Sequence, residues 1–163
     1  MLMIIDESMK ITGRIKVFSR KAGSNEPWKL ESETKNLIMT AQNVGRDLLI
    51  QWLLGITTYP IGINWGAIGT GITTPTAGDT QLAAETNRTI PAFTEDYAFN
   101  EAVFQFFFPD STLVNQIYYE FGTFVAGSNT ANSGQIFNHA LFTVPYSKSA
   151  GSDTTIEVDI NIS

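Results

Sequence analysis

Few residues of this chain have the types and the spacing that catalysis requires. His139 is its only histidine and cysteine is absent, so one copy cannot build a two-histidine metal site or a cysteine–histidine pair. No GxSxG motif supplies a serine nucleophile. The run Asn138-His139-Ala140 is strand-like, which favours a partly exposed structural histidine over a catalytic one.

Carboxylates gather at Glu95-Asp96, with Glu101 shortly after them. Two acids could serve as the acid and the nucleophile of a glycosidase, but adjacent acids in a turn are more often solvated. Asp79 and Asp153 lie in turns that could bind calcium, yet the DxDxDG spacing is absent. We therefore expect no catalytic residue, no cofactor and no metal ion, and a small hydrolase is the third of three functional hypotheses.

The segment 69–86, GTGITTPTAGDTQLAAET, has the most distinctive local pattern. Its first two glycines allow the backbone to leave strand geometry, and Thr-Pro and Gly-Asp are typical of turns. Asp79 or Thr80 could cap a helical turn over Leu82–Glu85. A phosphate-binding loop needs a lysine after its last glycine, and a dinucleotide-binding turn needs a third glycine at a fixed offset. Both are missing, so the segment indicates architecture.

Composition limits the classes of partner. The formal net charge is -6, which argues against nucleic acid, because phosphate binding needs clustered Lys and Arg. Charged residues make up 16% and hydrophobic residues 43% of the chain, so we expect partners to bury some apolar surface.

Two apolar stretches lack the features of export or membrane signals. Met1–Ile5 is apolar, but acidic residues follow at once and a positively charged region is absent. Residues 48–78 have no charge, but a glutamine, an asparagine, prolines and glycines interrupt them. We predict a buried helix and a buried strand there, and no membrane partner.

Hydrophobic periodicity predicts an antiparallel β-sandwich, jelly-roll-like, of about eight strands with one inserted helix. The helix is expected over 40–55, with Thr40 as its cap and Gly55 at its end. Pro91 places one strand at an edge or a bulge. A single domain is expected over residues 1–163. The predicted strands are 11–19, 28–38, 61–68, 88–94, 101–108, 115–125, 136–144 and 154–162.

The first two strands form an N-terminal hairpin, 11–35, that carries most of the early basic residues. Such a cluster is usually a solvated face, but it could dock on an acidic neighbour. The hairpin is therefore a candidate docking element. The candidate assembly interface consists of Arg14, Lys16, Phe18, Arg20 and Trp28.

Aromatic side chains on a β scaffold could instead form a platform for stacking sugars. Core packing explains most of them more simply, and the amide-rich loop Asn129–Gln135 has no ring of its own. The aromatic residues in question are Trp28, Trp65, Tyr59, Tyr97, Tyr118 and Tyr119.

Segments spread over residues 11–162 follow an ordered pattern. A Lys-Asn-Leu-Ile segment leads into a helix that ends in glycine, at 35–55, and the pattern of 69–86 is followed by Arg88. The strand Tyr119–Phe124 is similar to a Glu-Val-Gly-Leu-Phe type strand, with Phe and Thr in place of aliphatics, and an aromatic strand, Lys148 in a turn and an alternating strand close the chain. This order resembles a class of bacteriophage virion structural proteins found among tail-fibre, baseplate and collar (neck) components.

The resemblance implies a non-enzymatic β-rich structural module that acts through protein contacts. Its partners would be other virion proteins and further copies of itself, in a homo-oligomer that buries the excess apolar surface. Its place would be the virion, assembled in the host bacterial cytoplasm. A capsid decoration protein, such as a head fibre or cement protein, is the alternative within this class. A module that binds host glycans is the second hypothesis, from a different class.

Overall fold

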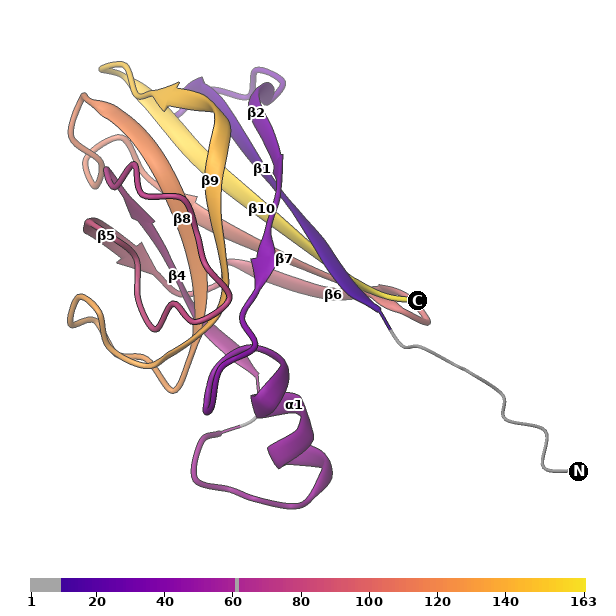
Figure 1. Cartoon of the computed structure of the whole chain (residues 1–163). Helices are drawn as coiled ribbons and strands as arrows, with labels where there is room; N and C mark the ends of the chain where they lie inside the picture. Colours follow the sequence, from indigo (N-terminus) through magenta and orange to yellow (C-terminus); the bar gives the residue numbers. More distant parts are fainter. Residues whose placement is uncertain (1–9, 61) are drawn as a thin grey trace, which may run out of the picture.

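Residues 10–60 and 62–163 are described by the computed structural model, and their strands form two antiparallel five-stranded sheets packed face to face (Figure 1). The antiparallel β-sandwich with one helix is confirmed, with ten strands in place of about eight. In spatial order the first sheet contains β2 (Lys29–Lys35), β1 (Ile11–Lys21), β10 (Ser152–Ile162), β7 (Glu101–Phe108) and β6 (Phe93–Ala98). The second contains β3 (Leu37–Ile38), β9 (Gln135–Ser147), β8 (Ile117–Val125), β4 (Ile63–Gly69) and β5 (Glu85–Thr89).

The chain crosses between the two sheets after β2, β5, β7 and β9. Strands β1 and β2 form the predicted N-terminal hairpin, and β1 also pairs along its whole length with β10. The predicted strand 61–68 corresponds to β4, and Ile61 lies outside the described residues. Met1–Met9 lies outside them as well.

Alternating side chains on the facing sides of the sheets form the main core. Ile15 of β1 and Val158 of β10 are fully buried partners in the first sheet, as their alternation with polar residues requires. Phe106 of β7 meets Phe121 of β8 across the sandwich, with ring centroids 5.4 Å apart. Gly66 is required here, because a Cβ would lie 2.6 Å from the ring of Phe106.

A second, smaller core lies on the other face of the β4–β8–β9 sheet. Two segments, 39–45 and 70–84, cover this face, and we call them the outer cover. The N–H of Thr40 donates to the carbonyl of Ala77, which ties one segment to the other. The buried side chains of this core are Met39, Val44, Ala67, Leu82, Phe124 and Ile136.

The helix is shorter than predicted. Helix α1 covers Arg46–Leu53, and its cap residue is Gly45 at a φ of 50°, with no side-chain cap. Thr40 is not the cap, because its N–H bonds the outer cover and the chain turns again before α1 begins. The predicted end is confirmed: Gly55 has a φ of 70° and its N–H bonds the carbonyl of Trp52.

Two further expectations are wrong. The predicted strand 88–94 is divided between β5 and β6, because the chain leaves one sheet and joins the other around Pro91, which has no N–H to donate. Leu82–Glu85 is not a helical turn; it is an irregular segment that ends as β5 begins at Glu85. The backbone N–H groups that a helical turn would use are bound by a side chain of the sheet, described below.

Candidate functional site

The single histidine lies between two carboxylates in the second sheet and the outer cover. Nδ1 of His139 is 2.8 Å from Oδ2 of Asp79, and Nε2 is 2.9 Å from Oε2 of Glu120. The side chains of His139 and Glu120 are 2% and 0% exposed, so the prediction of a partly exposed histidine is wrong. Two acceptors on opposite sides of the ring require both ring nitrogens to donate, which is the arrangement of an imidazolium ion.

The charges of this triad support one another. Burial alone would lower the pKa of His139, but hydrogen bonds and attraction to Glu120 and Asp79 raise it above its ordinary value. Burial would raise the pKa of Glu120, but His139 and backbone N–H groups lower it. The pKa of Asp79 is also lowered: its burial is outweighed by hydrogen bonds from Thr76 and by His139. Each of these shifts favours the charged form of its group.

Glu120 also collects backbone donors from the outer cover. Its Oε1 accepts the N–H of Gly71 at 3.0 Å and that of Ala84 at 2.7 Å, and its Oε2 accepts the N–H of Ala83 at 3.0 Å. A carboxylate that binds three N–H groups holds both ends of segment 70–84 on the sheet. Gly69 is needed beside it, because a Cβ there would lie 2.5 Å from Oε1 of Glu120.

Both ring nitrogens of the triad are occupied by carboxylates. The ring of His139 therefore has no free lone pair to act as a base. The hydroxyl of Thr76 donates to Oδ1 of Asp79 at 2.6 Å. A hollow of about 350 Å³ beside Asp79 and His139 is lined mainly by small and polar residues of segment 73–83. We call Asp79, His139 and Glu120 the fastener, because together they hold the outer cover on the second sheet.

A second buried cluster fixes the loop between β8 and β9. The guanidinium of Arg88 donates to both carboxylate oxygens of Glu85, at 2.6 and 2.9 Å, and to the carbonyl oxygens of Ser128 and Ser133. The same group lies 5.7 Å from the ring centroid of Trp65. Arg88 is thus used to hold the loop that the sequence indicated as small and polar.

A third cluster fastens the turn between β9 and β10. Nζ of Lys148, which is fully buried, donates to Oδ1 of Asp110 at 2.5 Å and to the carbonyl of Ser149 at 2.8 Å. Asp153 accepts the N–H groups of Gly23 and Asp110. The two aspartates considered for calcium, Asp79 and Asp153, therefore both have protein donors. In the described ranges, no group of three or more His, Asp or Glu side chains is arranged to hold a metal ion.

The acidic pair considered for glycoside hydrolysis lies on the edge strand β6. Glu95 is exposed and pairs in register with Val103 of β7, while Glu101 is half-buried at the start of β7. The side chain of Asp96 lies outside the described residues. The described acids share a hollow of about 380 Å³ with Lys16, on the outer face of the first sheet.

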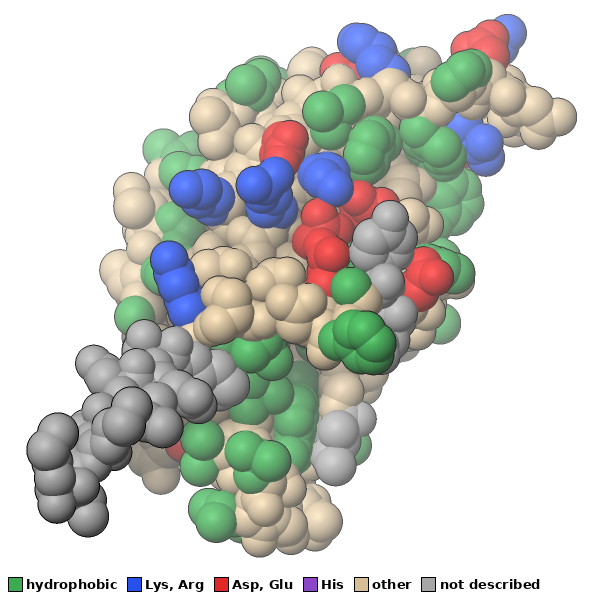
Figure 2. All heavy atoms as spheres, turned by 90° about the vertical axis from the view of Figure 1, so that its right-hand side faces the viewer, with side chains coloured by type: hydrophobic (Ala, Val, Ile, Leu, Met, Phe, Trp, Pro, Cys, Tyr) green, Lys and Arg blue, Asp and Glu red, His purple; other side chains and the backbone are tan. Residues whose placement is uncertain are grey.

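The candidate interface residues on β1 share the outer face of the first sheet. Lys16 is largely neutralised there: its Nζ lies 2.9 Å from both Glu157 and Asp159 of the adjacent strand β10, and these acids raise its pKa against the effect of burial. Arg14 pairs with Glu33 of β2 at 3.2 Å. Figure 2 shows Lys and Arg side chains in a row beside a group of Asp and Glu side chains. The charges of this face are balanced within the chain.

The other candidate residues form an aromatic contact at the far end of the hairpin. The guanidinium of Arg20 lies 4.3 Å from the ring centroid of Trp28, and that ring meets Phe107 edge-on at 6.4 Å. Phe18 is half-buried on the same strand. The structure thus gathers all five residues on one hairpin, with Trp28 covered on one face by Arg20.

Three aromatic residues of the sugar-platform hypothesis are covered or buried. Arg88 lies over Trp65, Arg20 lies over Trp28, and Tyr118 is fully buried. The side chain of Tyr97 lies outside the described residues.

The surface that sequence reasoning missed is apolar and lies around α1. Ile50, Leu53 and Leu54 are 50%, 81% and 70% exposed, and the helix extends below the sandwich in Figure 1. Figure 2 shows hydrophobic side chains on the lower part of the molecule, beneath the charged band. The signal was present in the sequence: 46–54, RDLLIQWLL, is apolar on nearly all sides of the helix, more than one buried face can use.

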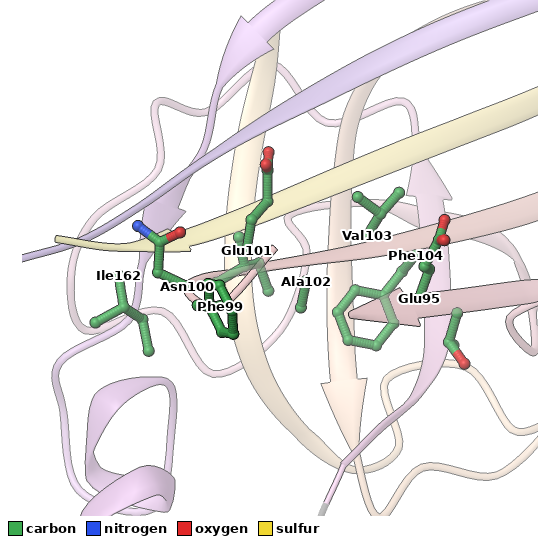
Figure 3. A pocket seen from close by; sticks show the side chains of 10 residues that line it. Glu95, Phe99, Asn100, Glu101, Ala102, Val103, Phe104 and Ile162 are labelled. Atoms are coloured by element: carbon green, nitrogen blue, oxygen red, sulfur yellow. The ribbon is translucent and has the colours of Figure 1, made fainter. Parts of the chain in front are cut away.

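A shallow apolar groove lies at the end of the first sheet, above α1 (Figure 3). Ala102, Phe104 and Ile162 point to the same side of the sheet, while Val103 and Glu101 point to the other. Phe99, at the turn between β6 and β7, is fully exposed.

A scan of protein-family models, a search of curated proteins and a search of solved structures each found no match. No helix in the part of the chain that the structure describes is long and apolar enough to span a membrane.

Proposed function

We propose that this protein is a structural assembly module that binds further copies of itself and other virion proteins of a bacteriophage, as a neck, collar, baseplate or fibre-attachment component. The observation that carries the assembly role is the exposed apolar surface of α1. Leu53 and Leu54 are 81% and 70% exposed on consecutive residues, with Ile50 and Ile56 beside them in sequence at 50% and 42%. Contiguous exposed apolar side chains of this kind are typical of protein interfaces.

The fastening clusters support a non-catalytic role. Each of the three ionic clusters binds backbone groups of a loop, and none pairs a nucleophile with a free base. Catalytic groups would have to remain available to a substrate, whereas these groups are saturated by the protein itself.

The same clusters give the phage-like sequence pattern a physical meaning. Gly69 and Gly71 leave room for the carboxylate of Glu120, and Asp79, Glu85 and Arg88 bond groups of the loops on the second sheet. A pattern of this kind specifies a rigid scaffold, which is what a virion component requires. The virion assignment itself rests on the resemblance.

Light scattering of the purified chain over a concentration series tests the assembly role. We expect a discrete oligomer, and Leu53→Glu should shift it toward the monomer because a charge would be buried in the interface. Ile72→Glu is the matched control, since Ile72 is 71% exposed and follows the opposite end of β4. A wild-type monomer at every concentration, or an equal effect of both variants, would contradict a role of α1 in self-assembly.

A further inference from the structure

The groove at the end of the first sheet is an extension of the main core that no element of the second sheet covers. Strands β1, β10, β7 and β6 continue past the second sheet on the right of Figure 1. On the core-facing side of this end, Ile160 is 8% exposed but Ile162, two residues further along β10, is 39% exposed. The groove has a volume of about 400 Å³, and its apolar walls come from Phe99, Ala102, Phe104, Ile160 and Ile162.

This face has the chemistry of a binding site for an extended apolar segment. Alternate residues of the neighbouring strands β7 and β10 point into the groove, and Ala102 is in register with Ile160. A small side chain therefore lies beside a large one on this face. Its rim is polar, with Thr94, Glu95 and Asn100. An apolar floor with a polar rim is the usual pattern of a protein interface.

The chain itself supplies a segment of matching chemistry near this groove. Lys10 exchanges two backbone hydrogen bonds with Ser163, at 2.6 and 2.9 Å, so the described chain begins where β10 ends. At the same end of the sheet, the N–H of Ile162 donates to the carbonyl of Asn100, next to the groove wall. Nine residues precede Lys10, and the first five are Met-Leu-Met-Ile-Ile.

We propose that Met1–Ile5 of one copy occupies this groove in a neighbouring copy. Five residues in extended form span roughly 17 Å, which is longer than two successive two-residue repeats along β7 or β10. Unbranched Met and branched Leu and Ile side chains are suited to filling a shallow apolar hollow.

A neighbouring copy is favoured over the same copy by the direction of the chain at Lys10. Lys10 continues the antiparallel pairing of β1 to Ser163, the residue after β10, so the backbone still runs along the strand axis there. Entry into the groove of the same copy would require the chain to turn back beneath the sheet. Exchange between copies needs no such reversal. This inference rests on the proposed self-assembly, to which it adds a second contact between copies.

Disulfide trapping tests the exchange directly, because the natural chain has no cysteine. Ile4→Cys and Ala102→Cys are made as separate full-length variants, mixed and oxidised. We expect a cross-linked dimer in the mixture and little in either variant alone. Ile4→Cys mixed with Val114→Cys is the matched control, since Val114 is 65% exposed and lies before β8, outside the groove. Cross-linking no greater than in this control would overturn the proposal.

The double variant Ile4→Cys/Ala102→Cys separates exchange from self-occupation. Exchange predicts dimers and longer chains, whereas a monomer with an internal disulfide, formed in dilute solution, would overturn the exchange. Removal of Met1–Ile5 provides a second readout: the apparent dissociation constant of the oligomer should rise at least about tenfold, with unchanged circular dichroism.

These results distinguish the two proposals. If the truncated chain keeps the oligomer of the full chain, the groove inference fails while assembly through α1 stands. If the full chain is monomeric at every concentration, both fail.

Discussion

At the residue scale, three backbone N–H groups and one imidazolium converge on the carboxylate of Glu120, so any atom added to this space should act directly on stability. Gly71→Ala places a methyl group against Oε1 of Glu120 and Cβ of Ala83. We expect a loss of about 1–3 kcal/mol in the free energy of unfolding, measured by urea denaturation. Gly78→Ala is the matched control, because no atom lies within 4 Å of a Cβ there.

The control also sets the outcome that would contradict this view. Gly78 lies in the same segment of the outer cover as Gly71, so both substitutions affect the unfolded chain in the same way. Equal stability of the two variants would mean that Glu120 can move aside without losing its N–H partners, and that the fastener is not tight.

Sequence reasoning at this scale identified His139 and Asp79, but neither Glu120 nor the contacts among the three. A structural role for His139 and a turn role for Asp79 both follow from local patterns. Their meeting with Glu120 does not, because His139 is 60 residues from Asp79 and 19 from Glu120 along the chain. Glu120 looked like one polar residue of an alternating strand, and only the outer cover explains how a carboxylate is fully buried there.

At the scale of single elements, α1 carries a core residue and an exposed apolar residue within one turn and a half of helix. Leu48 is fully buried in the main core, and Leu53 is 81% exposed. Leu48→Ala should therefore cost about 2–5 kcal/mol of unfolding free energy. Leu53→Ala should change the stability of the dilute chain by less than about 0.5 kcal/mol.

Urea denaturation at low protein concentration, paired with light scattering at high concentration, checks both values. Leu53→Ala should weaken the oligomer although it leaves the fold intact. A stability loss at Leu53 comparable to that at Leu48 would show that this helix face packs within the chain, and the assembly surface would have to lie elsewhere.

The same helix shows which element boundaries a sequence can predict. Its end follows from Gly55, because a left-handed residue there is a local requirement. Its start does not follow from Thr40, because a contact distant in sequence, between Thr40 and Ala77, takes that backbone group first. Pro91 likewise marked an irregularity, but only the arrangement of the sheets turns it into a crossing between β5 and β6.

At the scale of the whole molecule, the sandwich is predictable because it needs only alternation and turns. The final strand shows why: Ile156, Val158 and Ile160 alternate with polar residues and all three are buried. The outer cover is not predictable in this way, because 70–84 has neither strand nor helix periodicity and is positioned by side-chain contacts. Because the outer cover is held by the charged groups of Asp79, Glu120 and His139, the free energy of unfolding should depend on pH.

The sign of that dependence follows from the three charged groups of the fastener. The pKa of His139 is raised in the folded state from an ordinary value of 6.5, so its contribution is complete below pH 6.5 and is lost as the pH rises through the folded pKa. The pKa values of Asp79 and Glu120 are lowered from 3.8 and 4.5, so their contributions are complete above those values and are lost in more acidic solution. Stability should be greatest between about pH 5 and 6.5.

The alkaline side of this profile can be assigned to one residue, because the other groups with raised pKa values, Lys16, Tyr118 and Tyr146, start from ordinary values of 10.0 or higher. We expect the unfolding free energy of the wild-type chain to fall between pH 6.5 and 9. His139→Gln keeps a hydrogen-bonding side chain but cannot be protonated, so its free energy should be lower at pH 6 and nearly constant over the same range. Urea denaturation at half-unit pH steps measures both curves, and parallel slopes in the two proteins would mean that His139 is neutral in the folded state and that Glu120 holds the outer cover through its backbone N–H bonds alone.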